Sequence, residues 1–328
     1  MIQYIARRLA FMVVSLFAIS FVAFVIIELP PGDYLTLYIN QLTIRGERVD
    51  EARIESLKAE YGYGQPFMVR YYKWVSGIVV RGDFGRSLQW REPVSDLIMR
   101  RLPVTVLIST MTIIFTYLVA IPIGIYSATH QYSISDYVVM MFGFIGLAVP
   151  SFLLAMFLMY FLYTQLGVPP GGLFSDQYRD AAWSLGKVVD LGKHLIVPII
   201  VTGMAGTAGG IRGLRATLLD ELWMDYVETA RVKGLSETRL VLKYPVRVAL
   251  NPMFSTVGHV LPAIVSGATI VDVVLNLPTV GPLLLGSLKS QDMYLAGSLV
   301  FILTFLTLVG VFISDIVLVI SDPRIRYE

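Results

Sequence analysis

The stretch DELWMDYVETARVKGLSETRLVLKYPVRVALNP, residues 220–252, is a charged island between two long apolar segments. When a helix is counted from Trp223, five residues recur at the spacing of one helix face, namely Trp223, Tyr226, Val227, Ala230 and Gly234. Three polar residues fall on the opposite face, namely Asp225, Glu228 and Thr229. The pattern therefore predicts a short amphipathic helix inside a polar connection.

Glycine, serine and proline divide this stretch further. Gly234 is expected to end the first helix and Ser236 to cap a second one, which Pro245 should end or kink. The stretch is thus predicted to fold as helix, glycine turn and helix, held at both ends by the membrane. A plainer alternative is a solvated loop whose positive charge fixes the membrane topology.

The composition indicates a membrane protein that crosses the bilayer several times. Of the 328 residues, 55% are hydrophobic and only 15% are charged, against roughly 25% charged residues in a soluble domain. The mean hydropathy is +0.68. The chain has no cysteine, so it has neither a disulfide framework nor a thiolate metal site. The net charge is +2 without a basic aromatic patch, and we expect no nucleic-acid partner.

Long uncharged runs predict six transmembrane helices. The first covers residues 9–29 and is long enough to cross the bilayer core, which needs about twenty apolar residues. No small-residue cleavage site follows it, so we expect it to be retained. Arg7 and Arg8 place residues 1–8 in the cytoplasm. The other five spans are expected near residues 102–129, 137–165, 195–219, 253–275 and 294–320.

The polar segments alternate between the two sides of the membrane. Residues 30–101 are expected to form an extracytoplasmic helical loop domain, because loops of this length translocate regardless of their charge. Within it we expect two helices and one tight turn, at residues 51–61, 67–80 and 81–87. Basic residues place the stretch 220–252 and the tail 321–328 in the cytoplasm. Both termini are therefore expected to be cytoplasmic.

The sequence Glu228-Thr229-Ala230, followed by Gly234, resembles the EAA loop of ATP-binding-cassette importers. In the inner-membrane subunits of these importers, Glu-Ala-Ala is followed by three residues and a glycine. Thr229 replaces the middle alanine, and Tyr244-Pro245-Val246 stands where the family often has Leu-Pro. In that family the loop forms coupling helices that dock into a groove on a separate ATPase subunit.

Further segments resemble the permeases of the dipeptide/oligopeptide class, of the first-permease type. They are PPGDY from Pro30, YGYGQP from Tyr61, RGDFGRS from Arg81, IVDVV from Ile270 and DPRIRY from Asp322. This resemblance runs from the first span to the tail. It implies an all-α polytopic membrane protein with the type I ABC importer permease fold. Residues 102–320 would form the permease core, containing the coupling loop 220–252.

The resemblance assigns the coupling role to Tyr226, Glu228, Thr229, Ala230, Arg231 and Gly234. It implies that Glu228 pairs with a basic residue of the ATPase subunit. Ala230 would have to stay small in order to pack in the groove of that subunit, and Gly234 would allow the turn.

The source of energy is expected to lie outside this chain. No GxxxxGK[ST] phosphate-binding loop occurs, and GPLLLGSLKS at residues 281–290 is a chance likeness to one. The resemblance implies that this chain binds neither a cofactor nor a metal and carries no catalytic residue. It also implies that two separate ATPase subunits bind ATP–Mg. The other implied partners are a homologous permease in a heterodimer, an extracytoplasmic substrate-binding protein and membrane lipid. The expected location is the cytoplasmic (inner) membrane of a prokaryote.

Two groups of residues are candidates for the pathway or its gate. Pro150 and Ser151 fall near the middle of the third span, where they could line the path or simply form a packing kink. Asp272 stands where the family carries Glu, followed by Pro278 and Gly281 at a re-entrant turn. A carboxylate near the membrane suggests a use. The alternative is a solvated or helix-capping role.

The sequence leaves the solute open. Peptides are the commonest solutes of this class, with an oligosaccharide or a nickel complex as alternatives. An ion-coupled secondary transporter would need a carboxylate in mid-span, for which Asp315 is the main candidate. An intramembrane enzyme would need a motif such as GxSxG, which is missing. A channel-like scaffold would not explain the docking loop.

Overall fold

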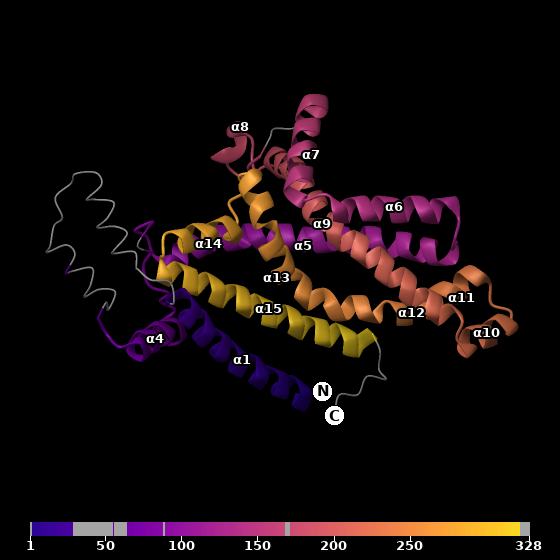
Figure 1. Ribbon diagram of the computed structural model, residues 1–328, viewed down its shortest axis with the longest axis horizontal. Coiled ribbons are helices and arrows are strands. Elements are labelled where there is room, and N and C mark those ends of the chain that lie inside the picture. Colours follow the sequence, from indigo (N-terminus) through magenta and orange to yellow (C-terminus); the bar gives the residue numbers. More distant parts are fainter. Residues whose placement is uncertain (1, 29–54, 56–63, 88, 168–170, 322–328) are drawn as a thin grey trace. The chain divides into compact units, whose positions relative to one another are not determined.

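A computed structural model describes residues 2–28, 55, 64–87, 89–167 and 171–321. It leaves out the side chains of residues 2–5, 26–28, 166, 256–267 and 317–321. The described residues form helices and no named strand (Figure 1). In chain order these are α1 (Ile2–Glu28), α4 (Phe67–Ser76), the π-helix η1 (Gly77–Arg81), α5 (Val94–Thr129), α6 (Ile134–Ala148), α7 (Ser151–Leu166), α8 (Asp176–Arg179), α9 (Leu185–Leu222), α10 (Asp225–Val232), α11 (Glu237–Lys243), α12 (Pro245–Ala249), α13 (Asn251–Val274), α14 (Val280–Lys289) and α15 (Met293–Ser321).

Four of these helices, α1, α5, α9 and α15, are long and apolar enough to cross a membrane. Helices α6 and α7 together are apolar enough for a fifth span but meet at 106°. Helix α13 has 24 residues, about 36 Å at 1.5 Å per residue, and occupies the place of the predicted fifth span. The prediction of an all-helical, polytopic membrane protein is confirmed. The third span is a sharply bent pair rather than the single kinked helix expected from the sequence.

Several helices are longer than the apolar runs that predicted them. Helix α1 begins at Ile2, α5 at Val94 and α9 at Leu185, each well before the start predicted for its span. Hydropathy detects only the part of a helix that matches the bilayer core, whereas polar first turns continue the same helix outside it. These three helices therefore begin before the apolar runs from which their spans were predicted.

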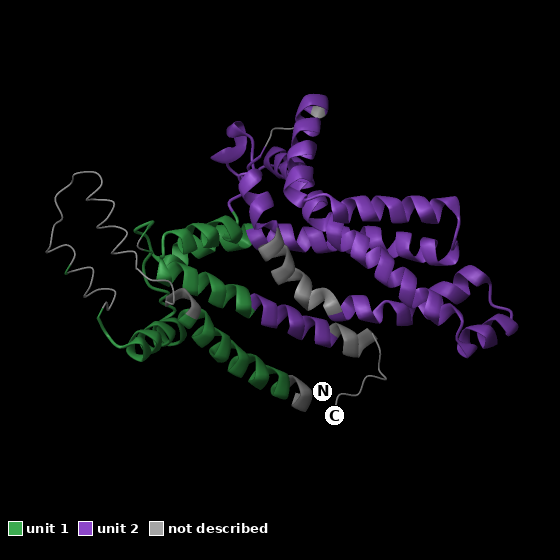
Figure 2. Ribbon diagram, in the orientation of Figure 1, with its two compact units in different colours: residues 1–104, 279–305 green, residues 105–278, 306–328 purple. Residues whose placement is uncertain are grey.

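The chain divides into two compact units, coloured separately in Figure 2. Unit 1 comprises residues 1–104 and 279–305, and unit 2 comprises residues 105–278 and 306–328. In unit 2, helix α9 is central, and α6, α7, α12 and α13 pack against it. The stretch 220–252 therefore belongs to unit 2 and follows directly from its central helix.

Glycines let α5 approach α9 closely in unit 2. A Cβ atom on Gly203 would lie 2.7 Å from the ring of Phe115, and one on Gly210 would lie 3.0 Å from Ala120. The hydroxyls of Thr112 and Thr202 form a hydrogen bond of 3.0 Å between the same two helices. Small residues thus allow the two helices to pack closely.

In unit 1 an aromatic cluster joins α4 to α1. The helix predicted for residues 67–80 is confirmed as α4 and η1, and its Trp74 is 4% exposed. Trp74 stacks on Phe24 with ring centres 5.5 Å apart, and Tyr71 contacts Phe21 edge-on at 5.2 Å. The helix predicted for residues 51–61 and the tail motif DPRIRY lie outside the described residues.

The turn predicted for residues 81–87 is confirmed, and its end is anchored. Gly82 and Gly85 have φ angles of +65° and +83°, which favour glycine. The Ser87 hydroxyl donates a 2.6 Å hydrogen bond to the carboxylate of Asp292, which is fully buried. The backbone N–H of Gln89 donates to the same carboxylate at 3.1 Å.

Candidate functional site

The stretch 220–252 folds into three short helices between α9 and α13 (Figure 1). Ser236 is the N-cap residue of α11, and Pro245 is the first residue of α12. The predicted order of helix, glycine turn and helix is confirmed, and the second helix ends before Pro245 as predicted.

Gly234 makes the turn between α10 and α11. Its φ angle is +81°, and its N–H donates a 3.0 Å hydrogen bond to the carbonyl of Arg231. A Cβ atom at this position would meet nothing within 4 Å. Glycine is therefore favoured here by the left-handed backbone and not by lack of space.

The inner face of α10 is fixed to its own chain. Val227 is fully buried and Ala230 is 7% exposed. Both belong to an aliphatic core shared with Leu218 of α9 and Leu240 of α11. The sequence suggested that Ala230 must be small in order to enter a groove on a partner. The structure instead buries this side chain inside the chain itself, so the size limit is internal.

The sequence placed Trp223 on the same helix face as Val227 and Ala230, and this prediction is wrong. Helix α9 ends at Leu222, and Met224 is extended with φ −77° and ψ 144° before α10 begins. A helical count that starts at Trp223 therefore runs through a break in the helix. Trp223 is 88% exposed, and Tyr226 is 39% exposed.

The outer face of α10 points away from the chain. Asp225, Glu228, Thr229 and Val232 are all exposed at the spacing i, i+3, i+4 and i+7. Trp223 lies just before the N-terminus of this helix. We call these five residues the docking face. The outward position of its three polar members is confirmed.

The sequence interpretation missed the two apolar members of the docking face. Val232 is 83% exposed, and the signal that could have found it is its position four residues after Glu228 on the polar face. Exposed tryptophan is unusual on a solvated helix and common at the centre of protein interfaces. The docking face thus combines carboxylates with an exposed aromatic anchor.

Two polar contacts hold α10 in place, one to α9 and one to α11. The Tyr226 hydroxyl donates a hydrogen bond to the carboxylate of Glu221 in α9. Partial burial and this bond raise the pKa of the Tyr226 hydroxyl, which therefore stays neutral and keeps donating.

Across the glycine turn, the guanidinium of Arg231 donates to both carboxylate oxygens of Glu237, at 2.6 and 3.3 Å. This contact raises the pKa of Arg231 and lowers the pKa of Glu237. Arg231 was predicted as a coupling residue, and the structure pairs it within the loop.

A groove of about 830 Å³ lies beside the docking face in unit 2. Its walls come from the end of α5, the end of α9 and the start of α11. The lining includes Tyr126, His130, Leu219, Trp223, Arg231 and Val241. Trp223 therefore borders both the docking face and a concave surface.

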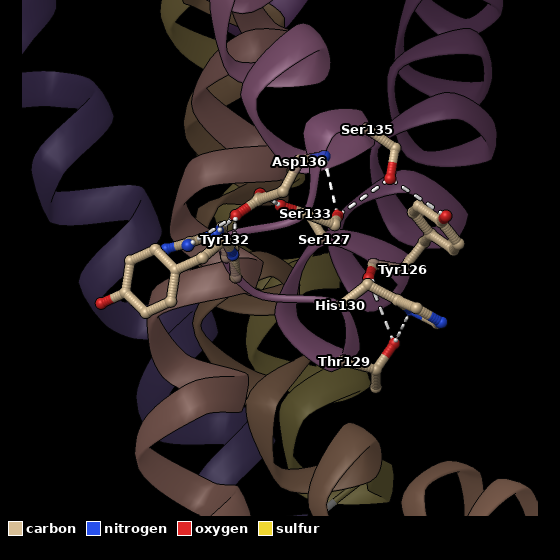
Figure 3. A network of polar contacts seen from close by, with 9 residues as sticks. Tyr126, Ser127, Thr129, His130, Tyr132, Ser133, Ser135 and Asp136 are labelled. Atoms are coloured by element: carbon tan, nitrogen blue, oxygen red, sulfur yellow. Dashed lines mark hydrogen bonds and ion pairs between the residues drawn. The ribbon is translucent and has the colours of Figure 1, made fainter.

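A buried ion pair joins α9 to the first turn of α6. Asp136 is 3% exposed and accepts hydrogen bonds from the Ser127 hydroxyl and the Tyr132 N–H (Figure 3). Arg215 of α9 donates to both oxygens of this carboxylate, at 3.2 and 2.9 Å. The side chain of Arg215 is only 19% exposed. Tyr132 has a φ angle of +63°, and its bond to Asp136 helps to hold that conformation.

The candidate pathway residues take different positions. Pro150 is the N-cap of α7, and it lies with Ser151 at the 106° corner between α6 and α7, where both are exposed. This is a corner rather than the mid-helix kink predicted from the sequence. Both sides of the corner pack on α9.

Asp272 lies near the C-terminal end of α13 and is 5% exposed. The alternative of a solvated carboxylate is therefore wrong. Its backbone carbonyl accepts the N–H of Leu277 at 2.8 Å, which closes the chain reversal after α13. Pro278 is half-buried just after this reversal, and Gly281 is buried in α14 of unit 1.

Among the described residues, no group of three or more His, Asp or Glu side chains could hold a metal ion.

Comparison with known proteins identifies the class. Residues 120–327 match the family model described as "Binding-protein-dependent transport system inner membrane component". Residues 1–109 match the model of the N-terminal part of the same membrane components. The chain belongs to this family. It is a membrane-spanning permease subunit of a transport system and not an enzyme.

Individual relatives cover the whole chain. The oligopeptide transport system permease protein AppB of Bacillus subtilis (strain 168) is 35% identical over 329 residues, which is 100% of both chains. The glutathione transport system permease protein GsiC of Escherichia coli (strain K12) is 30% identical over 330 residues, again 100% of both. The oligopeptide transport system permease protein OppB of Haemophilus influenzae is 28% identical over 329 residues, with the same coverage.

Proposed function

We propose that this chain is the permease of an ATP-driven importer for peptide-class solutes and receives mechanical work through α10. The observation that carries this proposal is the docking face, an exposed surface on a short helix whose opposite side is buried in the core of unit 2. The peptide class rests on the relatives, whose names specify oligopeptides and glutathione. An oligosaccharide or a nickel complex remains the alternative solute.

The docking face has the chemistry of a protein contact. Trp223 offers an apolar anchor, and Asp225 and Glu228 offer carboxylates near the N-terminus of α10. A partner with an apolar pocket rimmed by basic residues would complement both features. In our proposal this partner is one of two ATPase subunits, which bind ATP–Mg. Glu228 would pair with a basic residue of that subunit.

Two attachments would carry a push on α10 into the membrane. The aliphatic core around Val227 and Leu240 joins α10 and α11 to the last turns of α9. The Asp136–Arg215 ion pair joins α9 to the first turn of α6. A displacement of α10 would therefore move α9 and α6 together, as switching between two packings of rigid elements requires.

The remaining components follow from the same proposal. A homologous permease forms the other half of the pathway, and an extracytoplasmic substrate-binding protein delivers the solute. Both termini and the docking face lie in the cytoplasm. Pro150, Ser151, Asp272, Pro278 and Gly281 are the candidates for the pathway or its gate.

The docking face is tested with Trp223→Ala and Glu228→Lys in the transporter reconstituted into liposomes. Loss of an interface tryptophan costs about 2 kcal/mol, so solute uptake should fall roughly 30-fold or the ATPase subunits should dissociate on purification. Asp180→Lys makes the same charge change as Glu228→Lys at an exposed position next to α8 and should leave uptake unchanged. Full uptake by both docking-face variants would refute the coupling role.

A further inference from the structure

Helix α4 leaves a second apolar surface uncovered. Its inner side chains, Phe67, Tyr71 and Trp74, pack on α1. On another side of the same helix, Met68 is 61% exposed and Tyr72 is 72% exposed. Val79 in the following η1 is 62% exposed. These three residues form an exposed stripe that the core of unit 1 does not use.

The contacts of α4 fix its depth relative to a membrane span. The uncharged run of α1 begins at Leu9 and ends at Ile27, just before Glu28. The Tyr71 hydroxyl forms a 2.9 Å hydrogen bond with the hydroxyl of Ser20 and donates to the carbonyl of Phe17 at 3.4 Å. Ser20 is seven residues before the end of this run, which is about 10 Å at 1.5 Å per residue. Helix α4 therefore lies alongside the last part of the span rather than beyond it.

That depth matches an interfacial helix. Amphipathic helices that lie in the membrane plane bury their apolar face about 5–10 Å into the boundary of headgroups and acyl chains. The exposed residues of α1 in the same region, Phe17 at 45% and Val22 at 54%, continue the same kind of surface. The exposed polar residues Lys73 and Arg81 can reach anionic headgroups.

We propose that α4 and η1 form an interfacial helix whose exposed stripe, Met68, Tyr72 and Val79, inserts into the lipid leaflet at the C-terminal end of α1. The occupant of this surface is lipid, because a soluble protein would have to enter the bilayer to cover residues at the depth of Ser20. The inference does not depend on the solute or on the coupling role of α10.

The absence of cysteine makes the test direct. Met68→Cys, Tyr72→Cys and Val79→Cys are each labelled with a nitroxide in the full transporter, reconstituted in nanodiscs of phosphatidylethanolamine and phosphatidylglycerol. Lys73→Cys is the control, because its side chain is polar, exposed and next to Tyr72 in the chain. Retained ATPase activity and assembly show that each labelled variant is folded.

We expect oxygen to collide with the three stripe labels several-fold more often than a water-soluble nickel chelate does, and the reverse at Lys73→Cys. Nickel access at Tyr72→Cys equal to that at Lys73→Cys would place the stripe in water and overturn the proposal. Low collision with both reagents would show that protein covers it, with the same consequence. Nickel access that is lost only on adding the substrate-binding protein would assign the surface to that protein instead.

Discussion

Helices α10 and α4 are both short, amphipathic and attached to a membrane span, yet their free faces differ. Helix α10 is fixed by aliphatic side chains and presents carboxylates, a threonine and two apolar residues at its ends. Helix α4 is fixed by aromatic rings and presents Met68 and Tyr72. The buried face decides where a connecting helix sits. The free face decides whether its partner is a protein or lipid.

The largest effect is expected from the aromatic anchor of α4. Trp74→Ala removes a side chain that is 4% exposed and contacts Phe24 and Phe301. Losing a buried aromatic side chain costs about 3–5 kcal/mol, so we expect a lower unfolding temperature and faster proteolysis within residues 64–93. Tyr72→Ala, on the exposed stripe, is the matched control and should lower stability less, because it leaves the aromatic contacts inside unit 1 intact. Equal destabilisation by the two variants would erase the distinction between the two faces of α4.

The next effect concerns the ion pair between α6 and α9. Asp136→Leu leaves Arg215 partly buried without its carboxylate, which should cost about 3 kcal/mol. We expect reduced thermal stability and reduced coupling of ATP hydrolysis to uptake. The double variant Asp136→Leu with Arg215→Met should recover much of the stability, because it removes both charges. If the double variant restored stability but not coupling, the ion pair itself would be needed for transmission. If it restored both, the pair would matter for packing alone.

A smaller effect is expected at the turn of α10. Gly234→Val forces a β-branched residue into a φ angle of +81°, at a cost of about 1–2 kcal/mol. Uptake should fall while the subunit still inserts into the membrane, as measured by its yield in membranes. Gly192→Ala, at a helical glycine with nothing within 4 Å of the added atom, should have no such effect. Normal uptake by Gly234→Val would show that the turn tolerates a shifted α10.

The smallest effect is the pH dependence of the same turn. Because Arg231 lowers the pKa of Glu237, the pair stabilises the turn above the ordinary carboxyl pKa of about 4.3 and loses this contribution as the pH falls through the lowered value. Hydrogen exchange at residues 233–235 should therefore speed up at the acidic end, after correction for intrinsic rates. Glu237→Gln should show faster exchange throughout and lack this step. A step of the same size in Glu237→Gln would assign it to another group.

Local patterns predicted the elements of both helices but not the partners of their side chains. Spacing predicted the helix at residues 67–80. Gly234, Ser236 and Pro245 correctly predicted where the helices of the stretch 220–252 begin and end. The face of α10 was wrong at Trp223 because a helix count cannot detect the break at Met224. No local signal could pair Asp136 with Arg215, since that contact depends on how α6 packs against α9. The depth of burial of Asp272 likewise comes from the packing of distant segments.

The hydrogen bond between Ser87 and Asp292 has a consequence for biosynthesis. It joins residues 205 positions apart, and unit 1 as a whole is assembled from residues 1–104 and 279–305. A ribosome releases the first part long before it makes the second. Residues 1–104 therefore lack part of their packing partners until residues 279–305 have been synthesised. Truncated products that stop before residue 279 would lack the buried carboxylate and should be targets for membrane proteases.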